Sequence, residues 1–486
     1  MKKSNGSMRA IAISNSIWKF GERIIAQGVS LLVSIVLARI LSPDDFGIVG
    51  IVTIFFNLAN VIISGGLNTA LIQKKDSDKE DYSSVLIVCV LVSFALFGIL
   101  WFTAPVIAGI YHNDLLIAMI RVMGLSLPVY AIKSIVCAYI SSSLKFKAFF
   151  FATLGGTLVS AVVGITMALN GFGAWALIAQ QVTNTTIDTI ILYAMTRMPI
   201  SLHFSFSKFK ALYKYGWKVF VSSMIDAIYN QSLPLFIGTK FTSADLSFYT
   251  KGRQFPGAVS GTTTSTLNAV LFPILAKQQD DKSIVLNYIR KFMQLSSFIL
   301  FPIMLGIFAV ADNFVSVILT DKWLPAVVYL RLFCLSDMFT LIHSGNCETI
   351  KAIGRSDIFL KMELIKKTSY FVIIAVFMVF ARTPLALAFS MIVCNLVAIL
   401  VNSFPNRKLI GYKYTLQLMD LLPNFFCAAV MAIIVVLFGR IQFQSKLLLL
   451  IIQILLGAIV YSVACIVTKN KSFFYILGMA KEKLGK

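Results

Sequence analysis

Charged residues are scarce in this chain. Asp, Glu, Lys and Arg together make up 13% of its 486 residues, about half of the share that soluble domains carry. Histidine occurs only at His112, His203 and His343, positions too scattered to predict a metal cluster. Apolar residues supply 58% of the sequence. This balance excludes a typical soluble protein and indicates a chain that folds in a membrane.

Motifs of enzyme chemistry are also missing. The sequence contains no P-loop, no nucleophile elbow and no paired-metal cluster. Its seven cysteines fall in or near apolar runs without metal-ligand spacing, so they are interpreted as small apolar side chains. A cleavable signal peptide is not expected either, because the first apolar run continues to Ile40, beyond the length of a signal h-region. We therefore expect neither an enzyme nor a cofactor.

Long apolar runs are what the chain has in abundance. A membrane-spanning helix needs about 20 residues, and such runs predict an all-α integral membrane protein with about fourteen transmembrane helices. Lys and Arg concentrate in alternate connections, which places those connections and both termini in the cytoplasm. The net charge of +22 is therefore a topology signal, and no nucleic-acid partner is expected. The helices are expected near residues 14–40, 44–70, 83–104, 115–139, 150–169, 174–196, 214–238, 247–273, 289–311, 325–350, 358–380, 384–405, 418–438 and 446–468.

A short hinge separates the first two helices. Ser42, Pro43 and Asp45 fit the N-cap, N1 and N3 positions of a helix. Ser-x-x-Asp is a capping-box pattern, and proline suits N1 because it lacks the N–H that would be orphaned there. The sequence therefore predicts that the second helix starts near Pro43. Two glycine pairs, Gly65-Gly66 and Gly155-Gly156, are expected inside helices, where they would permit bending or close packing.

The same region carries a family resemblance. The segments Glu22-Arg23, Leu37–Gly47 (LARILSPDDFG) and Ala70–Asp76 (ALIQKKD) are similar to the Wzx-type exporters of colanic and teichuronic acid units. These exporters belong to the multidrug, oligosaccharidyl-lipid and polysaccharide transporter superfamily. The similarity is specific over about 70 residues and looser beyond. Further along, Tyr249, Arg253 and Pro256 resemble the family's eighth-helix pattern.

The resemblance implies a function. It implies a flippase that moves a polyprenyl-pyrophosphate-linked oligosaccharide across the bacterial cytoplasmic membrane by alternating access, for surface polysaccharide biosynthesis. Expected partners are the lipid-linked oligosaccharide, membrane lipids and other polysaccharide assembly proteins. The alternative is a cation-coupled small-molecule or multidrug antiporter of the same fold. A polymerase or ligase fits less well because the outer connections are short. A major-facilitator porter fits less well because it should have a Gly-Asp-Arg-rich loop after helix 2, whereas Gln73–Tyr82 is QKKDSDKEDY.

An internal repeat is expected in the chain. Thr242 and Asp245 repeat Ser42 and Asp45 at an offset of about 200 residues, and further matches follow at an offset of about 210. Because each copy holds about six helices, the copies should be parallel repeats. We therefore expect an N-terminal lobe at 1–200, a C-terminal lobe at 201–410, and a remainder at 411–486 with the last two helices and a basic cytoplasmic tail. An amphipathic inner linker, Arg197–Lys218, should open the second lobe.

Polar residues inside the apolar helices are the candidate site. Stripes of such residues on helices 1, 2, 7 and 8 predict one water-filled cavity between the lobes. The alternative is polar packing between helices. For the acidic residues, ion coupling and local pairing both remain open, as do cavity and snorkelling positions for Lys133. The expected substrate-binding residues are Arg23, Gln27, Asn57, Asn60, Lys133, Asn230, Arg253 and Asn268, and the expected ion-coupling residues are Asp188, Asp226 and Asp337.

Overall fold

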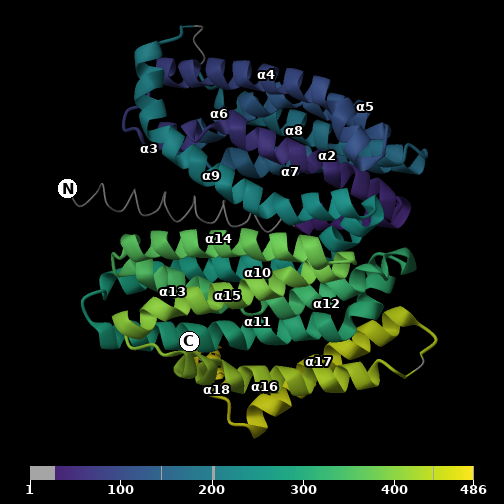
Figure 1. Cartoon of the computed structure of the whole chain (residues 1–486). Coiled ribbons are helices and arrows are strands. Elements are labelled where there is room, and N and C mark those ends of the chain that lie inside the picture. The colour runs from purple at the N-terminus through teal and green to yellow at the C-terminus, as the bar shows by residue number, and fades with distance from the viewer. Residues whose placement is uncertain (1–27, 144, 200–202, 442, 485–486) are drawn as a thin grey trace. The chain divides into compact units, whose positions relative to one another are not determined.

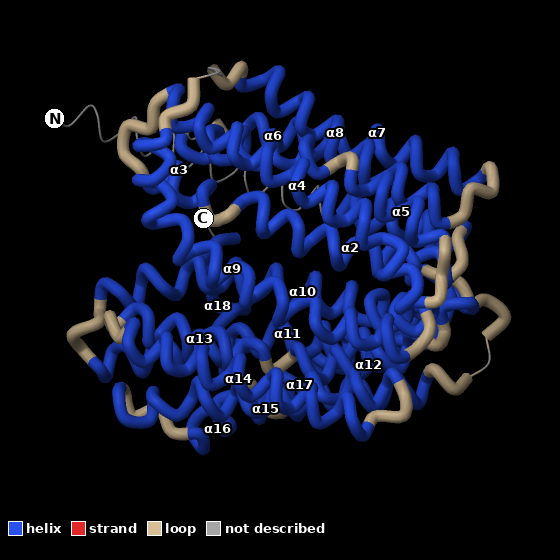
Figure 2. The backbone as a smooth tube through the Cα atoms, turned by 45° about the horizontal axis from the view of Figure 1, so that its top comes forward, coloured by secondary structure: helices blue, strands red, loops and turns tan. Residues whose placement is uncertain are grey.

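The computed structural model describes residues 28–143, 145–199, 203–441 and 443–484. All regular elements in these ranges are helices, joined by short loops (Figure 2). A helix over Gly28–Ile40 comes first. It is followed by α2 (Pro43–Ser64), α3 (Leu67–Gln73), α4 (Lys79–Tyr111), α5 (Leu115–Gly124), α6 (Leu127–Ser142), α7 (Lys147–Leu169), α8 (Ala174–Thr196), α9 (Phe206–Lys240), α10 (Ser243–Lys277), α11 (Lys282–Ile318), η1 (Asp321–Trp323), α12 (Ala326–Asp337), α13 (Thr340–Ala352), α14 (Ser356–Phe380), α15 (Pro384–Leu409), α16 (Tyr414–Phe438), α17 (Lys446–Val467) and α18 (Lys471–Leu484).

Two compact units divide the chain, residues 1–247 and 248–486. In the first, α4 packs against α5 and α6, and α8 packs against α6 and α7. In the second, α11 packs against α12 and α13, and α15 packs against α13 and α14 (Figure 1). Each unit therefore uses the same packing pattern. The helix α9 packs against α2, α3 and α4 in the first unit, whereas the sequence analysis counted it in the second lobe. The predicted lobe boundary near residue 200 concerns the repeat and stays a prediction.

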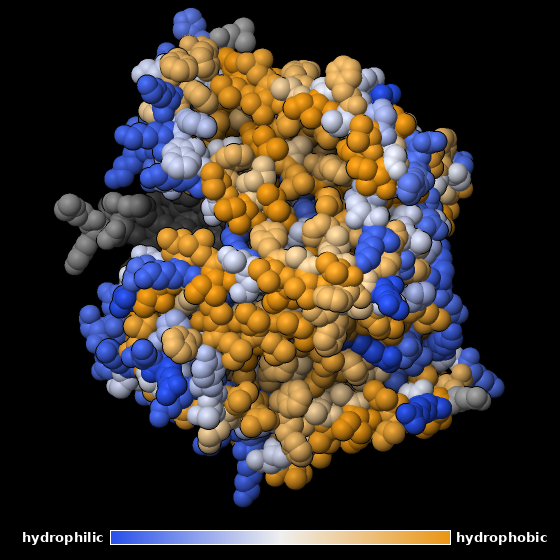
Figure 3. Space-filling view, in the orientation of Figure 1, coloured by the Kyte–Doolittle hydropathy of each residue, from blue (hydrophilic) through white to orange (hydrophobic). Residues whose placement is uncertain are grey.

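The helices have the length and composition of membrane spans. Nine spans in the described part of the chain are long and apolar enough to cross a bilayer, counting α5 with α6 and α12 with α13 as one span each. Large apolar side chains remain exposed on them, among them Phe102, Leu169 and Leu455. On the visible face of each unit, hydrophobic residues cover the middle of the helices and hydrophilic residues gather toward their ends (Figure 3). This is the pattern of a surface that meets lipid. The count of fourteen helices stays a prediction.

The predicted capping box at the start of α2 is confirmed. The Ser42 hydroxyl accepts a hydrogen bond from the Asp45 N–H at 3.2 Å, and the Asp45 carboxylate accepts one from the Ser42 N–H at 2.9 Å. The start of α10 has the same exchange between Thr242 and Asp245, at 3.1 and 3.2 Å. The two copies of the repeat, about 200 residues apart, therefore share the capping hydrogen bonds as well as the residue types.

Three helices that were expected to be continuous are interrupted. The second ends at Gly65 and Gly66, whose φ values of 51° and 69° lie in the left-handed region that glycine tolerates. The placement of this pair inside a helix was therefore wrong. A Cβ on Gly66 would overlap the backbone carbonyl of Gly216, so the break also lets α9 approach closely. The expected helices 115–139 and 325–350 are each divided, into α5 and α6 and into α12 and α13.

The expected amphipathic linker is also different in the structure. From Phe206 onward it forms the first turns of α9, which continues without interruption to Lys240. The later part of the expected linker thus belongs to this helix, because hydrogen bonding along the helix continues past the aromatic and basic residues. Its amphipathic position at the inner surface stays a prediction. Pro234 lies inside this helix and is buried without ending it. By contrast, Gly155 and Gly156 do permit close packing: their Cβ atoms would collide with Ile191 and Asp188 of α8.

Candidate functional site

An ion pair joins two helices inside the first unit. Lys133 of α6 places its Nζ 2.7 Å from the Oδ2 of Asp188 on α8. The two side chains are 24% and 9% exposed, so the pair is largely shielded from its surroundings. Asp188 fits here because Gly156 of α7 leaves room for its carboxylate. For Asp188, where coupling and pairing were both open, the structure shows a pair. Pairing was not among the alternatives for Lys133, which were a cavity position and snorkelling. The Oδ1 of Asp188 has no hydrogen-bond partner in the described part of the chain.

The polar residues of α8 form a stripe that the sequence analysis missed. Gln181, Asn184 and Asp188 follow at steps of three and four residues and so share one face of the helix. Gln181 meets Thr53 of α2, and Asn184 meets Ser160 of α7, each at 3.4 Å. With the Lys133 ion pair, α8 thus makes polar contacts with three neighbouring helices. The signal was present in the sequence as polar residues at helical spacing within an apolar run.

The predicted asparagines of α2 lie on the same helix as Thr53. Asn57 and Asn60 are both partly buried. The side-chain oxygen of Asn60 is buried and accepts no hydrogen bond within the described residues. An unsatisfied buried carbonyl costs about 1 to 3 kcal/mol, so a polar group from outside the described structure would be bound favourably there. The assignment of these two residues to a substrate site stays a prediction.

The second unit brings Arg253 and Asp337 together. Arg253 lies on α10 with its guanidinium carbon 5.8 Å from the ring centroid of Phe333. Asp337, at the end of α12, interacts with it electrostatically and accepts a hydrogen bond from Ser260 at 3.4 Å. Gly252 enables this approach because a Cβ there would lie 2.5 Å from the Cβ of Tyr329. The glycine at this position therefore lets α10 lie close against α12.

Other predicted residues are not brought into these two groups. Asp226 and Asn230 are exposed on α9, and the Asn230 amide donates to the Asp226 carbonyl at 2.9 Å. Arg23 and Gln27 lie outside the described residues, and only the helical backbone is described at Asn268. Glu348 of α13, another acidic residue within a helix, forms an ion pair with Lys351 at 3.0 Å.

A polar network in the second unit was not foreseen. His343 of α13 contacts the amide of Asn402 on α15. One turn further, the Asn346 amide donates to Ser403 at 3.1 Å and to Gln417 of α16 at 3.0 Å, and Asn406 donates to Asn346 at 2.7 Å. The side chains of this network are uncharged apart from the titratable ring of His343. Hydrogen bonds among buried groups of this kind fix helix positions.

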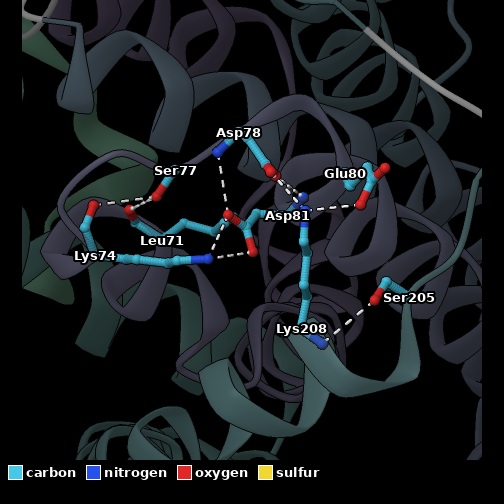
Figure 4. Close-up of polar contacts among 8 residues, drawn as sticks. All are labelled: Leu71, Lys74, Ser77, Asp78, Glu80, Asp81, Ser205 and Lys208. Atoms are coloured by element: carbon cyan, nitrogen blue, oxygen red, sulfur yellow. Dashed lines mark hydrogen bonds and ion pairs between the residues drawn. The ribbon is translucent and has the colours of Figure 1, made fainter.

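An ionic cluster lies at the loop between α3 and α4 (Figure 4). The Lys74 ammonium contacts the buried carboxylate of Asp81 at 2.6 Å, and Lys208 of α9 contacts both Asp78 and Glu80. The hydrogen bond from Lys208 holds the pKa of Asp78 at about 2, and the two carboxylates raise the pKa of Lys208. This cluster attaches the start of α9 to the loop before α4. Its role is to hold the helices, since both lysines are paired with carboxylates.

No group of His, Cys, Asp or Glu in the described residues could hold a metal ion. Six of the seven cysteines are buried and all are free, as small apolar residues would be. What the interior offers chemically is therefore charge and hydrogen bonding on membrane helices. Lys133 with Asp188 in one unit, and Arg253 with Asp337 in the other, are cation–carboxylate groups that can bind anions or exchange ions.

Comparison with known proteins gives a consistent family. The family model described as "Polysaccharide biosynthesis protein" matches residues 36–328, more than half of the chain. The succinoglycan biosynthesis transport protein ExoT of Rhizobium meliloti is 23% identical over 92% of this chain and 91% of its own. The lipopolysaccharide biosynthesis protein WzxC of Escherichia coli is 24% identical over 74% of each chain.

Solved structures show the fold. The lipid II flippase MurJ, in an inward closed conformation, superposes with a TM-score of 0.76 at 16% identity and covers 94% of this chain and 99% of its own. An inward-facing MATE transporter of the MOP superfamily superposes with a TM-score of 0.62 at 13% identity, over 79% of this chain and 94% of its own. The helices thus follow a fold shared by flippases and drug transporters.

Proposed function

Because the chain belongs to the polysaccharide biosynthesis protein family, as a Wzx-type transport protein and not an enzyme, we propose that it flips a lipid-linked oligosaccharide across the bacterial cytoplasmic membrane. The substrate would be a repeat unit carried on polyprenyl pyrophosphate, and the movement would proceed by alternating access. The observation that carries this proposal is the match of the family model across residues 36–328. Both termini are placed in the cytoplasm on the distribution of basic residues.

The intramembrane arginine supports a pyrophosphate substrate. An arginine at the centre of a lipid-facing helix costs about 2.5 to 3.5 kcal/mol on insertion scales, so Arg253 would not be kept there without a partner. A guanidinium binds phosphate oxygens through a fork of parallel donors that lysine cannot reproduce. In this proposal Arg253 binds the pyrophosphate, and Asp337 holds the guanidinium in place between transport steps. Arg23, which lies outside the described residues, is proposed for the same role in the opposite conformation.

The Lys133–Asp188 pair has a second role in the proposal. It is shielded by α7 and α8, and one carboxylate oxygen has no hydrogen bond in the described structure. When such a pair separates, the Lys133 ammonium can contact an anionic substrate. The Asp188 carboxylate can then bind a coupling ion. The shared cavity expected from the sequence, with Asn57, Asn60, Asn230 and Asn268 on its walls, stays a prediction. Asp226 and Asp337 stay proposed sites of ion coupling.

Glycan export by arginine variants tests the proposal. Arg253→Ala should lower export about tenfold or more, because a hydrogen bond to a charged group contributes about 1.5 to 3 kcal/mol. Arg253→Lys should recover only part of the export, since lysine lacks the fork. Arg382→Ala, at an exposed loop position, is the matched control and should export normally. Membrane levels of all variants are measured by immunoblotting.

Deletion distinguishes the alternative function. The fold is shared with a MATE transporter, so a small-molecule antiporter is the second candidate. A flippase predicts that deletion abolishes the surface polysaccharide and leaves drug sensitivity unchanged. Normal polysaccharide after deletion, together with drug resistance on overexpression, would contradict the flippase. Normal export by Arg253→Ala would instead remove only that arginine from the mechanism.

A further inference from the structure

A cationic pocket lies in the second unit, away from Arg253 and Asp337. It has a volume of about 320 Å³ and is open to solvent, a size at the lower end of ligand pockets. Two elements line it, the first half of α11 and the start of α18. The lining residues are Asn287, Arg290, Lys291, Gln294, Leu295, Lys471, Ser472 and Tyr475. Three of these are basic and none is acidic.

The wall formed by α18 is held in a fixed position. Asn470 caps this helix by accepting hydrogen bonds from the backbone N–H groups of Ser472 and Phe473, at 3.0 and 3.2 Å. Its own amide donates to Asn424 of α16 at 2.8 Å, and the Ser472 hydroxyl donates to the Gln294 carbonyl at 3.3 Å. Asn470 and Ser472 are both buried. The pocket is therefore built into the fold, because buried hydrogen bonds position the wall that α18 forms.

The arginine of the pocket is only partly used. Its Nε and Nη2 donate to the buried carboxylate of Asp420, each at 2.9 Å to the nearer oxygen. Gln294 and Tyr412 donate to the same carboxylate, at 2.7 and 3.0 Å. The Nη1 of Arg290 makes no hydrogen bond within the described residues. Asp420 thus orients the guanidinium and leaves one pair of N–H donors available.

The two lysines of the pocket have no carboxylate partner. Lys291 lies with its Nζ 3.7 Å from the ring centroid of Tyr475, and both Lys291 and Lys471 are exposed. Neither forms an ion pair in the part of the chain that the structure describes. Against the single carboxylate of Asp420, the pocket therefore has an excess of positive charge. A cluster of this kind attracts an anion, and an arginine with free donors favours phosphate.

The pocket lies at the level of the membrane surface. The membrane-spanning helix α17 ends at Val467, and α18 begins four residues later at Lys471. Phe474, Tyr475 and Leu477 of α18 are exposed large apolar residues, as in helices that rest on a bilayer. A helix of 37 residues such as α11 is about 55 Å long, so its first turns extend beyond a hydrocarbon core of about 30 Å.

We propose that this pocket binds a phosphate group at the membrane surface, with Lys291, Lys471 and the free donors of Arg290 as its ligands. The shared chemistry is a phosphate mono- or diester. The exposed apolar face of α18 favours the headgroup of an anionic phospholipid over a soluble phosphate. The bound lipid would fasten α18 to the second unit. The site is separate from the intramembrane residues, so it does not depend on which substrate the protein transports.

Lipid binding by the full-length protein in detergent tests the site. The probes are phosphatidylglycerol, phosphatidylcholine and inorganic phosphate, and the readouts are bound lipid by native mass spectrometry and the shift in Tm. The variant is Lys291→Gln with Lys471→Gln. The matched control is Lys277→Gln with Lys282→Gln, which removes two exposed lysines outside the pocket. A third variant, Lys291→Arg with Lys471→Arg, keeps the charge.

The expected result is a selective loss. The wild type should bind phosphatidylglycerol and gain Tm, and the glutamine variant should bind it roughly 25-fold more weakly, since each basic group near an anionic lipid contributes about a factor of five. The control and arginine variants should resemble the wild type. A Tm gain with inorganic phosphate as well would assign the site to soluble phosphates too. Equal phosphatidylglycerol binding by the wild type and the glutamine variant would overturn the proposal. Binding of phosphatidylcholine to the wild type as tightly as phosphatidylglycerol would overturn it too. A glutamine variant that is not monodisperse is replaced by Lys471→Gln alone, for which about a fivefold loss is expected.

Discussion

The same helix–helix contact is held by different chemistry in the two units. In the first, α6 and α8 are joined by the charged pair Lys133–Asp188 at 2.7 Å. In the second, the corresponding helices α13 and α15 are joined by His343 and the amide of Asn402. Lys133 and His343 stand at an offset of 210, the spacing of the repeat. Asn346 of α13 adds hydrogen bonds to Ser403 and Asn406 of α15, so uncharged polar contacts hold this packing in the second unit. A role of the first unit's charges in transport stays a prediction.

The location of the ion pairs differs in the same way. In the second unit Lys366 pairs with Glu363 one turn away on α14. The position that corresponds to Lys366 in the first unit is Gly156, which makes room for Asp188. At these corresponding positions the first unit joins two helices through charge, whereas Lys366 in the second unit pairs within one helix. Elsewhere the second unit also has an ion pair between helices, Arg290 of α11 with Asp420 of α16. A pair between helices can separate when the helices move, and a pair within one helix moves as a whole.

Replacing the charged pair by the neutral one is the strongest test of this comparison. Lys133→Met should lower the free energy of unfolding by about 3 to 5 kcal/mol, because it leaves the buried Asp188 carboxylate without its cation. Lys133→His with Asp188→Asn places an imidazole and an amide at these positions, the residue types that meet in the second unit, and should regain most of that stability. Both are measured as Tm and as the fraction of monodisperse protein in detergent. A double variant as unstable as Lys133→Met would show that the two contacts are not equivalent.

Export by the same double variant separates stability from function. If the charges of the first unit serve transport, the stable double variant should still export less glycan than the wild type. His343→Ala, which truncates the neutral contact in the second unit, is the matched control for a local packing loss. Normal export by Lys133→His with Asp188→Asn would mean that the ion pair is only structural.

The next effect concerns the helix break that only one copy has. Gly65 and Gly66 interrupt the first copy, whereas the residues at an offset of 200, Ser265 and Thr266, lie within the continuous α10. Gly66→Ala should cost roughly 2 to 4 kcal/mol, because φ is 69° and the new Cβ would meet the backbone of α9. Ser265→Gly in the other copy should cost only about 0.5 to 1 kcal/mol. Chemical denaturation in detergent measures both. Similar losses would contradict a special role for the break.

Local signals in the sequence predicted the parts of the fold that neighbouring residues determine. The capping boxes at Ser42 and Thr242 followed from residue types three apart. The apolar runs located the helices, although some ends, such as the start of α9 and the end of α4, differ by seven or eight residues. The breaks within the expected helices were not predictable, because apolar periodicity continues across Leu125 and across Met338. The glycine pairs show what local sequence cannot predict. Gly65-Gly66 ends a helix and Gly155-Gly156 does not, and only the contacts with α9 and α8 distinguish them.

The residue types of the candidate site were predictable from the sequence, but the contacts between these residues were not. Lys133 and Asp188 are 55 positions apart, and no local pattern connects them. The prediction of separate roles for these two residues therefore missed the contact between them. The polar stripe of α8 and the network around Asn346 could have been noticed from helical spacing. Their partners could not, because the order of helices in space depends on tertiary packing.

The smallest expected effect concerns the N-caps of α4 and α11. Asp78 caps α4 and also binds Lys208, whereas Asp281 caps α11 and accepts hydrogen bonds from Ser283 without such a lysine. The pKa of both carboxyls is lowered, that of Asp78 to about 2, and the largest cause is the Lys208 hydrogen bond in one case and the Ser283 hydroxyl in the other. Lys208→Met should therefore make the first cap resemble the second.

The pH dependence of the loss identifies its cause. A carboxyl whose pKa falls from 3.8 to about 2 on folding contributes stability that is fully present above pH 3.8 and is lost as the pH falls through about 2. Lys208→Met should consequently lower the Tm by a small, constant amount between pH 7 and about 4, since exposed ion pairs contribute little. Below pH 4 the difference from the wild type should shrink as Asp78 becomes protonated. Ser283→Ala, at the α11 cap, is the control and should leave the α4 cap unchanged. A difference that grows below pH 4 would show that Lys208 acts through a group other than Asp78.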